Sequence, residues 1–442
     1  MAVTETKKIR NIALLGHGGC GKTSLAEAMI YLSGDSDRLG KVSDGNTVLD
    51  YDPEEIKRGL SLNAACANIM WKDVKINIVD TPGYLDFEGE VNQGLRVADS
   101  AIIVVDAKAG IEVGCELAWG KASAAKLPTA FFVNKCDDSD ADFDRVFGEL
   151  HVKFGKSVCP VFFPLKSGKD VLMIDLVGMN VYKYDEKGKR YPVDLTAEHE
   201  SIAAKYKEVL MEAIAETSEE MLNKYFDGEE ITREEAVESI HNGIIDGSIV
   251  PVFCGSATNL WGVVTLLDAI NESFPRHTAK KNEKLADGTL TPIKADGETS
   301  IFIFKTIADP FVGKVSLFKV MNGSLKRDMT LNNLRSGVQE KISKIFTLKG
   351  KNQTEVEELA CGDIGMLAKL TDTNTNDTLT RGQTGAYMPT NYPTPYLCQA
   401  IVPATAKDES KISQSITKLL EEDLTLKFEN NAETKQMLVY GL

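Results

Sequence analysis

Residues 16–23, GHGGCGKT, combine closely spaced glycines with one lysine and one threonine, which is the spacing of a phosphate-binding loop. Glycines let consecutive backbone N–H groups converge on phosphate oxygens, and the helix that follows adds the positive end of its dipole. We expect Lys22 to neutralise nucleotide phosphates and the Thr23 hydroxyl to bind Mg²⁺. The predicted contacts of this loop are Gly16, His17, Gly18, Gly19, Cys20, Gly21, Lys22 and Thr23.

A second phosphate element, Asp-Thr-Pro-Gly at 80–83, follows the apolar run KINIVD. Asp80 has the place of a carboxylate that holds Mg²⁺, and Gly83 that of a γ-phosphate sensor. Between the two elements, Ser61 offers a hydroxyl on a polar segment, of the kind that reaches Mg²⁺ only when the γ-phosphate is present. The predicted metal contacts are Thr23, Ser61 and Asp80.

Another motif, FVNKCD at 132–137, is expected to recognise the nucleotide base, and it lies at the end of an apolar run. Guanine shows an amide N–H and an amine on one edge, and the Asp137 carboxylate can accept from both, which adenine cannot match. Asn134 is expected to face the other edge, and Lys135 to lie over the ring. Ser256 and Ala257, which follow a later apolar run, could present backbone N–H groups to the guanine oxygen.

These motifs need strands that end near one another. Short apolar runs at 11–15, 75–80, 101–107, 129–135 and 249–257 alternate with helical patterns. Alternating strands and helices predict an α/β fold with a mostly parallel, doubly wound sheet, whose ligand lies at the carboxyl ends of the strands.

The rest of the chain follows other patterns. We predict a nucleotide-binding domain at 1–290, with an inserted subdomain at 156–248 that contains a strand-like segment and an acidic helical stretch. Polar residues from 276 to 297 look like a linker. Short strands predict an antiparallel β-barrel domain at 297–390, and a strand–helix–strand pattern predicts a partial α+β domain at 391–442.

Charge and composition limit the possible partners. The formal charge of −15 argues against diffuse nucleic-acid binding, so RNA contact would need a local patch such as 341–351, and no DNA partner is expected. Eight scattered cysteines without a C-x-x-C pair predict reduced thiols rather than zinc sites or disulfides. No apolar run is long enough for a transmembrane helix, so we expect no membrane partner and a cytoplasmic location. We also expect a monomer.

With GHGGCGKT, RGLSLNAA, DTPGYLDFEGEV, NKCD and CGSA in this order, the chain resembles the translational GTPases, specifically elongation factor G and its paralogues. Region 156–248 is similar to the extra G-prime subdomain of that family, FKTIADPFVGKVSLFKVMNGSL to its second domain, and QAIVPATAKDESKISQSITKLLEED to the start of its third. The resemblance implies GTP and GDP as ligands, Mg²⁺ as cofactor and the ribosome as partner. It also implies that the chain is truncated within the third domain and does not drive translocation of tRNA and messenger RNA.

Four residues depart from the family pattern. Gly19 replaces a usual aspartate, Gly18 replaces a bulky apolar residue and leaves more open space, and Ser61 replaces a threonine. Tyr84 replaces the histidine that positions the attacking water, as in a branch of elongation-factor-G-like paralogues that share DTPGY. The predicted catalytic residues are Tyr84 and Lys22.

Three functions fit this pattern. The first is hydrolysis of GTP to GDP and phosphate on the ribosome, slower than with histidine because a phenol carries no positive charge near pH 7. The second is a GTP-dependent ribosome-binding switch with weak hydrolysis, for which Gly18, Gly19 and Tyr84 argue. The third is a ribosomal protection protein of the tetracycline-resistance type, whose deciding contacts lie in a fourth domain. A purely structural Tyr84, packed beside the switch helix, stays open.

Overall fold

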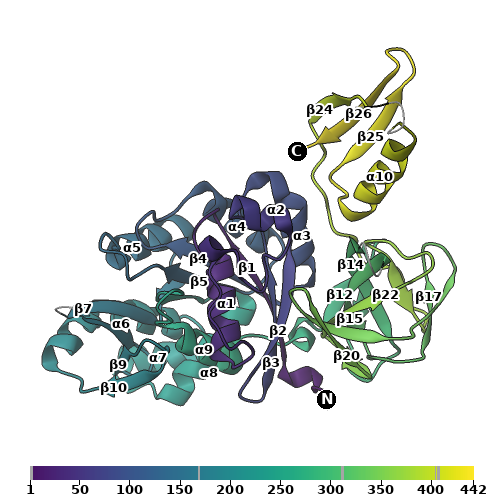
Figure 1. Cartoon of the computed structure of the whole chain (residues 1–442). Helices are drawn as coiled ribbons and strands as arrows, with labels where there is room; N and C mark the ends of the chain where they lie inside the picture. Colours follow the sequence, from purple (N-terminus) through teal and green to yellow (C-terminus); the bar gives the residue numbers. More distant parts are fainter. Residues whose placement is uncertain (1–2, 168–169, 310–312, 404, 406–408) are drawn as a thin grey trace. The chain divides into compact units, whose positions relative to one another are not determined.

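The computed structural model describes residues 3–167, 170–309, 313–403, 405 and 409–442 (Figure 1). Its contacts divide the chain into two compact units. The larger unit contains residues 10–83 and 98–279. The smaller unit contains the N-terminal residues through Ile9, residues 84–97 and residues 280–442.

The larger unit is built on a mixed sheet with strand order β2-β3-β1-β4-β5-β11-β6. Pairs β1–β4, β4–β5, β5–β11 and β11–β6 are parallel, and the β2–β3 hairpin is antiparallel. The central strands are buried along their whole length, as expected when helices cover both faces of a parallel sheet. The predicted α/β fold class is confirmed. The strands are β1 Ile9–Gly16, β2 Ala65–Trp71, β3 Val74–Asp80, β4 Ser100–Asp106, β5 Thr129–Asn134, β6 Val158–Pro160 and β11 Val250–Cys254.

Helices alternate with these strands along the chain (Figure 1). The helix α1 begins at Lys22, directly after the glycine-rich loop, and α2 is a short capped helix before Ser61. The helices of this sheet are α1 Lys22–Leu32, α2 Pro53–Arg58, α4 Val113–Ala124, α5 Phe143–Phe154 and α9 Val263–Ser273.

The inserted subdomain has its own antiparallel sheet of order β10-β9-β8-β7, with three helices. The predicted single strand-like segment is the hairpin β8–β9, and the predicted acidic stretch is two helices that separate where Ser218 caps the second. Strand β6 pairs with β11 in the main sheet, so the part outside that sheet begins after Pro160 rather than at residue 156. Its elements are β7 Phe162–Ser167, β8 Asp170–Asp175, β9 Asn180–Tyr184, β10 Arg190–Val193, α6 Ala197–Ala215, α7 Glu219–Asp227 and α8 Arg233–Asp246.

The smaller unit contains the predicted β-barrel domain. Its buried core includes Ile301, Phe318 and Leu367, from three neighbouring antiparallel strands. The residues predicted to be a plain linker contain the hairpin of β12 Asn282–Lys284 and β13 Leu290–Pro292. The barrel strands are β14 Ser300–Asp309, β15 Gly313–Asn322, β16 Ser324–Lys326, β17 Thr330–Asn333, β18 Gln339–Lys341, β19 Ile345–Lys349, β20 Asn352–Val356, β21 Glu358–Ala360, β22 Ile364–Ala368 and β23 Thr378–Thr380.

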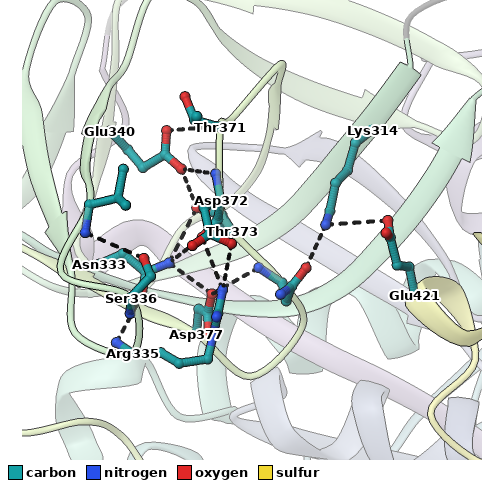
Figure 2. Close-up of polar contacts among 12 residues, drawn as sticks. Lys314, Asn333, Arg335, Ser336, Glu340, Thr371, Asp372, Thr373, Asp377 and Glu421 are labelled. Carbon is teal, nitrogen blue, oxygen red and sulfur yellow. Dashed lines mark hydrogen bonds and ion pairs between the residues drawn. The ribbon is translucent and has the colours of Figure 1, made fainter. Parts of the chain in front are cut away.

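A polar network fixes one side of the barrel (Figure 2). The buried Asp377 carboxylate accepts from Arg335 on one oxygen, and from Asn333, Arg335 and a backbone amide on the other. The buried Glu340 carboxylate accepts from two backbone amides and the Thr373 hydroxyl. Every oxygen of these buried acids therefore has a donor, as buried polar groups require.

The helix that follows the DTPGY motif, α3 Glu88–Val97, packs on the barrel within the smaller unit. Glu90 forms a largely buried ion pair with Lys305, and Lys319 donates to the Val97 carbonyl at 2.8 Å. The Arg96 guanidinium lies 4.5 Å from the centre of the Phe302 ring and donates to the Met388 carbonyl. A segment from the nucleotide-binding region thus belongs, by its packing, to the barrel.

The C-terminal piece is a three-stranded antiparallel sheet of order β24-β26-β25 with one helix. Its elements are β24 Leu397–Ile401, α10 Glu409–Glu422, β25 Lys427–Asn431 and β26 Gln436–Gly441, so the predicted strand–helix–strand gains one strand. Within the described residues, no helix has the length and apolar character needed to cross a membrane.

Candidate nucleotide-binding site

The phosphate-binding loop connects β1 to α1 through three glycines with positive φ: Gly16 at 137°, Gly19 at 83° and Gly21 at 96°. These are backbone conformations that residues with a side chain rarely adopt. A Cβ atom on Gly21 would also collide with the side-chain amide of Asn134, whereas one on Gly19 would meet open space. The loop is therefore shaped by glycine, and Gly21 makes room for the base-binding motif.

Lys22 lies at the start of α1, and its side chain is turned back over this loop. Its buried ammonium donates to the carbonyl oxygens of Gly16 at 3.1 Å and His17 at 2.8 Å. A cation at the positive end of a helix, surrounded by glycine amides, makes a site for an anion. Phosphate oxygens would replace the two carbonyls as acceptors.

The three predicted metal contacts lie together. The Thr23 hydroxyl donates to Asp80 Oδ2 at 2.7 Å, and its oxygen lies 3.1 Å from the Ser61 hydroxyl oxygen. Asp80 is 2% exposed, and its Oδ1 has no hydrogen-bond partner among the residues that the structure describes. Burial first, and the nearby Asp50 second, raise the pKa of Asp80 to about 7.

Asp50 is the residue of this site that the sequence analysis missed. Ser61 donates to Asp50 Oδ1 at 2.7 Å, while the buried Oδ2 finds no hydrogen-bond partner within the described parts of the chain. Asp50 is 6% exposed, and burial raises its pKa. It stands in an irregular segment before α2, and no motif spacing marked it.

The geometry fits a divalent cation that prefers oxygen ligands. The Thr23 and Ser61 hydroxyl oxygens lie 3.1 Å apart, and each also lies within hydrogen-bond distance of a buried carboxylate, Asp80 or Asp50. Two ligands bound side by side to octahedral Mg²⁺ at about 2.1 Å are about 3.0 Å apart. The residues present therefore fit Mg²⁺.

The segment that carries Ser61 is held by Glu55. Helix α2 has a capping box of Asp52 and Glu55 at its start and the left-handed Gly59 at its end. Beyond the helix, the buried Glu55 carboxylate accepts from the backbone amides of Leu62 and Asn63, both at 2.9 Å. Ser61 is thus positioned by backbone hydrogen bonds on its C-terminal side.

Gly83 lies against the phosphate-binding loop. A Cβ atom on Gly83 would collide with the Lys22 ammonium and would lie 2.7 Å from the Gly18 backbone nitrogen. The backbone of Gly83 therefore narrows the open space that we expected beside Gly18. Tyr84, the next residue, is assigned to the smaller unit, and its side chain is 47% exposed.

At the base end, Asn134 holds three segments together. Its side chain donates to the Cys20 carbonyl at 3.0 Å and accepts from the Ala257 amide at 3.0 Å. The Ser256 amide donates to the Trp261 carbonyl at 3.1 Å, and the buried Ser256 hydroxyl accepts from Asn259. Both backbone amides that we expected to donate to the guanine oxygen thus donate to acceptors within the protein. The Ala257 amide would have to give up its hydrogen bond to Asn134 in order to donate to the base.

The other two base residues differ in exposure. Lys135, in a left-handed backbone conformation, donates to the Gly19 carbonyl at 2.8 Å and pairs with Asp106 at 2.7 Å. The Asp137 side chain is exposed. A carboxylate in this position is available to a ligand, whereas Asn134 and Lys135 are already fixed.

The fold and the glycine-rich loop before α1 define a protein of the P-loop class. Residues 7–276 match the family model of the elongation factor Tu GTP binding domain, 298–382 that of elongation factor G domain 2, and 392–442 that of elongation factor G domain III. The chain belongs to the elongation factor G family of translational GTPases.

A solved crystal structure agrees with this assignment of the fold. A protein from Thermus thermophilus has a TM-score of 0.90 and 31% sequence identity to this chain. The alignment covers 98% of this chain and 64% of that one, so the chain spans less than two thirds of the length of this relative.

Proposed function

We propose that this chain binds GTP with Mg²⁺ and hydrolyses it to GDP and phosphate when it docks on the ribosome. The observation that carries the proposal is the oxygen cluster of Thr23, Ser61, Asp50 and Asp80 beside the Lys22 ammonium. Two buried carboxylates in this cluster each have an oxygen without a partner among the described residues. A bound cation would remove this cost of burial.

In this proposal Thr23 and Ser61 hold Mg²⁺ through their hydroxyls, and Asp80 and Asp50 orient them or bind its water ligands. When bound, Mg²⁺ neutralises charge on the phosphate oxygens. Lys22 binds the β- and γ-phosphates, and Gly83 senses the γ-phosphate through its backbone. Asp137 selects guanine. The monomeric state and the cytoplasmic location belong to the same proposal, as do the barrel domain at 297–390 and the partial domain at 391–442.

The ribosome as partner rests on the family and on the structure of the switch. Gly83 contacts the phosphate-binding loop, and the helix α3 that follows it packs on the barrel. A displacement of Gly83 by the γ-phosphate would therefore be passed along the chain to the barrel. In the candidate RNA patch at 341–351, Lys344 pairs with Glu355 at 2.8 Å, which offsets one of its positive charges.

Tyr84 is the proposed water-positioning residue. Its partial exposure leaves the phenol able to turn toward a docked partner, and a phenol can accept and donate hydrogen bonds without a positive charge. This predicts slow but measurable hydrolysis. The alternative, a GTP-dependent ribosome-binding switch with weak hydrolysis, is favoured by the same missing charge.

Single-turnover GTP hydrolysis with and without ribosomes tests the proposal. We expect ribosomes to accelerate hydrolysis, and Tyr84→His to be faster than the wild type by about tenfold or more, as for a positioned general base. A rate of GTP hydrolysis that ribosomes leave unchanged would contradict the proposal of a ribosome-stimulated GTPase. If the protein then still co-sediments with ribosomes only in the presence of GTP, the binding switch is the better account. Relief of tetracycline inhibition in a translation assay would instead favour a ribosomal protection protein.

A further inference from the structure

The Lys135 ammonium at the base end is held between two parts of the fold. It donates to the Gly19 carbonyl in the phosphate-binding loop at 2.8 Å, and it pairs with Asp106 Oδ2 at 2.7 Å. Lys135 itself follows β5, whereas Asp106 is the last residue of β4. One side chain therefore connects two strand ends with the phosphate loop.

Asp106 is itself firmly fixed. Its Oδ1 accepts from the backbone amides of Lys108 at 2.8 Å and Ala109 at 3.1 Å, which leaves Oδ2 for Lys135. Burial opposes ionisation, but the hydrogen bonds from Lys135 and from these amides lower the pKa of Asp106 below its usual value. The carboxylate is thus ionised and preorganised at neutral pH.

The strands place Asp106 beside the base motif. Strands β4 and β5 are parallel neighbours with Asp106 opposite Asn134, and the Ala107 amide donates to the Asn134 carbonyl at 2.9 Å. A parallel ladder fixes the relative position of two strand ends. Asp106 therefore holds Lys135 from a rigid element, although nothing in the motif spacing marked Asp106.

We propose that Asp106 is a positioning residue of the guanine site, which holds Lys135 against Gly19 and thereby slows the release of bound nucleotide. The inference rests on the proposed binding of guanine nucleotides. With its ammonium anchored at both partners, the Lys135 stem lies across the site as an apolar wall for the purine ring. Release of the nucleotide requires that this side chain and the phosphate loop separate.

The expected effect is moderate, because the Lys135 side chain is partly exposed and ion pairs in contact with water are weak. A lysine without a fixed partner regains rotamer freedom, and preorganisation of the site is lost. We expect Asp106→Asn, which keeps an oxygen for the Lys108 and Ala109 amides, to release GDP about three- to tenfold faster than the wild type.

The test measures the release of a fluorescent GDP analogue from the 442-residue protein by stopped flow, with thermal melts as a check of folding. Lys135→Met keeps the stem but removes the ammonium, so Asp106→Asn should add little in that background. Asp140→Asn is the matched control, because it removes a carboxylate that pairs with Lys108 at 2.6 Å outside the site. It should release GDP as the wild type does.

The release rates of these variants decide whether Asp106 positions Lys135. Equal release by Asp106→Asn and the wild type, or the same acceleration in the Lys135→Met background, would overturn the positioning role. If Asp106→Asn does not fold, Asp106→Ser, which also keeps an acceptor for the turn, takes its place. Absence of GDP binding by the wild type would overturn the proposed function together with this inference, whereas tight binding with unchanged release overturns the inference alone.

Discussion

The two ends of the nucleotide site are prepared in different ways. At the base end, Asn134 and Lys135 already have their hydrogen-bond partners, and Asp137 is left exposed for a ligand. At the phosphate end, Asp50 and Asp80 each have a buried oxygen without a partner among the described residues. One end is complete before the ligand arrives, and the other is completed by it.

The barrel shows that buried carboxylates elsewhere in the chain do find hydrogen-bond donors. Two buried acids there, Glu340 and Asp377, have donors for both oxygens (Figure 2). Buried carboxylates without such donors raise the free energy of the folded protein, so they persist where a ligand compensates them. The two acids at the phosphate end therefore support the proposed cation site.

The largest expected effect is at the complete end. Asp137→Asn exchanges an acceptor for a group that also donates, so guanine should bind about 1,000-fold more weakly while xanthine, with an oxygen in place of the amine, gains affinity. Competition between GDP and xanthosine diphosphate for a fluorescent nucleotide measures this. Asp140→Asn serves as the control, and unchanged guanine preference in Asp137→Asn would remove Asp137 from the site.

At the incomplete end, Mg²⁺ removal should be nearly as severe. Chelation with EDTA should speed GDP release by about 100-fold in the wild type, because the cluster loses its cation. In Asp80→Asn, release should already be fast in Mg²⁺ and change little on chelation. A rate of GDP release from the wild type that is the same with and without EDTA would contradict the metal site.

Part of the pH dependence of stability comes from Glu27, a residue of α1 that is 1% exposed and accepts from the Val48 amide at 2.7 Å. Burial raises its pKa to about 7, although hydrogen bonds from backbone amides oppose the shift. Since the folded protein binds a proton more tightly than the unfolded chain, the free energy of unfolding should fall as pH rises toward 7 and then level off. Asp80, whose pKa is also raised to about 7, adds a loss of the same sign.

Urea unfolding in EDTA should show a contribution from Glu27 of about 2 kcal/mol between about pH 5.5 and pH 8, taken as the difference between the wild type and a Glu27 variant. The isosteric Glu27→Gln variant should show a flatter profile over the same range. Equal profiles for the two proteins would show that Glu27 does not titrate in this window.

The smallest expected effect belongs to Asp50, which contacts Ser61. Asp50→Asn should lower the Mg²⁺ affinity of the GDP complex by about tenfold, as for carboxylates that orient metal ligands. A Mg²⁺ titration of GDP release measures it. Asp52→Asn, on a nearby helix cap, is the matched control, and an equal effect there would point to a general loosening of the segment.

Motif spacing marks candidate site residues at the ends of strands. Lys22, Thr23, Asp80 and Asn134 each follow or end a buried strand, and apolar periodicity locates such strands. Asp50 and Asp106 could not be found in this way. Asp50 lies in an irregular segment, and the role of Asp106 depends on the register between β4 and β5.

The fold was predicted best where the pattern was regular. The parallel strands, the barrel and the C-terminal helix were all expected. The hairpin β12–β13 and the helix α8 are polar and were taken for linker or left unassigned. The assignment of α3 to the barrel depends on tertiary contacts of Glu90, Arg96 and Val97, which no local pattern contains.

The most direct test of the account is calorimetric titration of the wild-type protein with GTP and with ATP, each in Mg²⁺ and in EDTA. The account predicts tight GTP binding in Mg²⁺, much weaker GTP binding in EDTA and no measurable ATP binding in either. GTP binding of equal strength in both buffers, or ATP binding as tight as GTP, would contradict a guanine site whose phosphate end is completed by a cation.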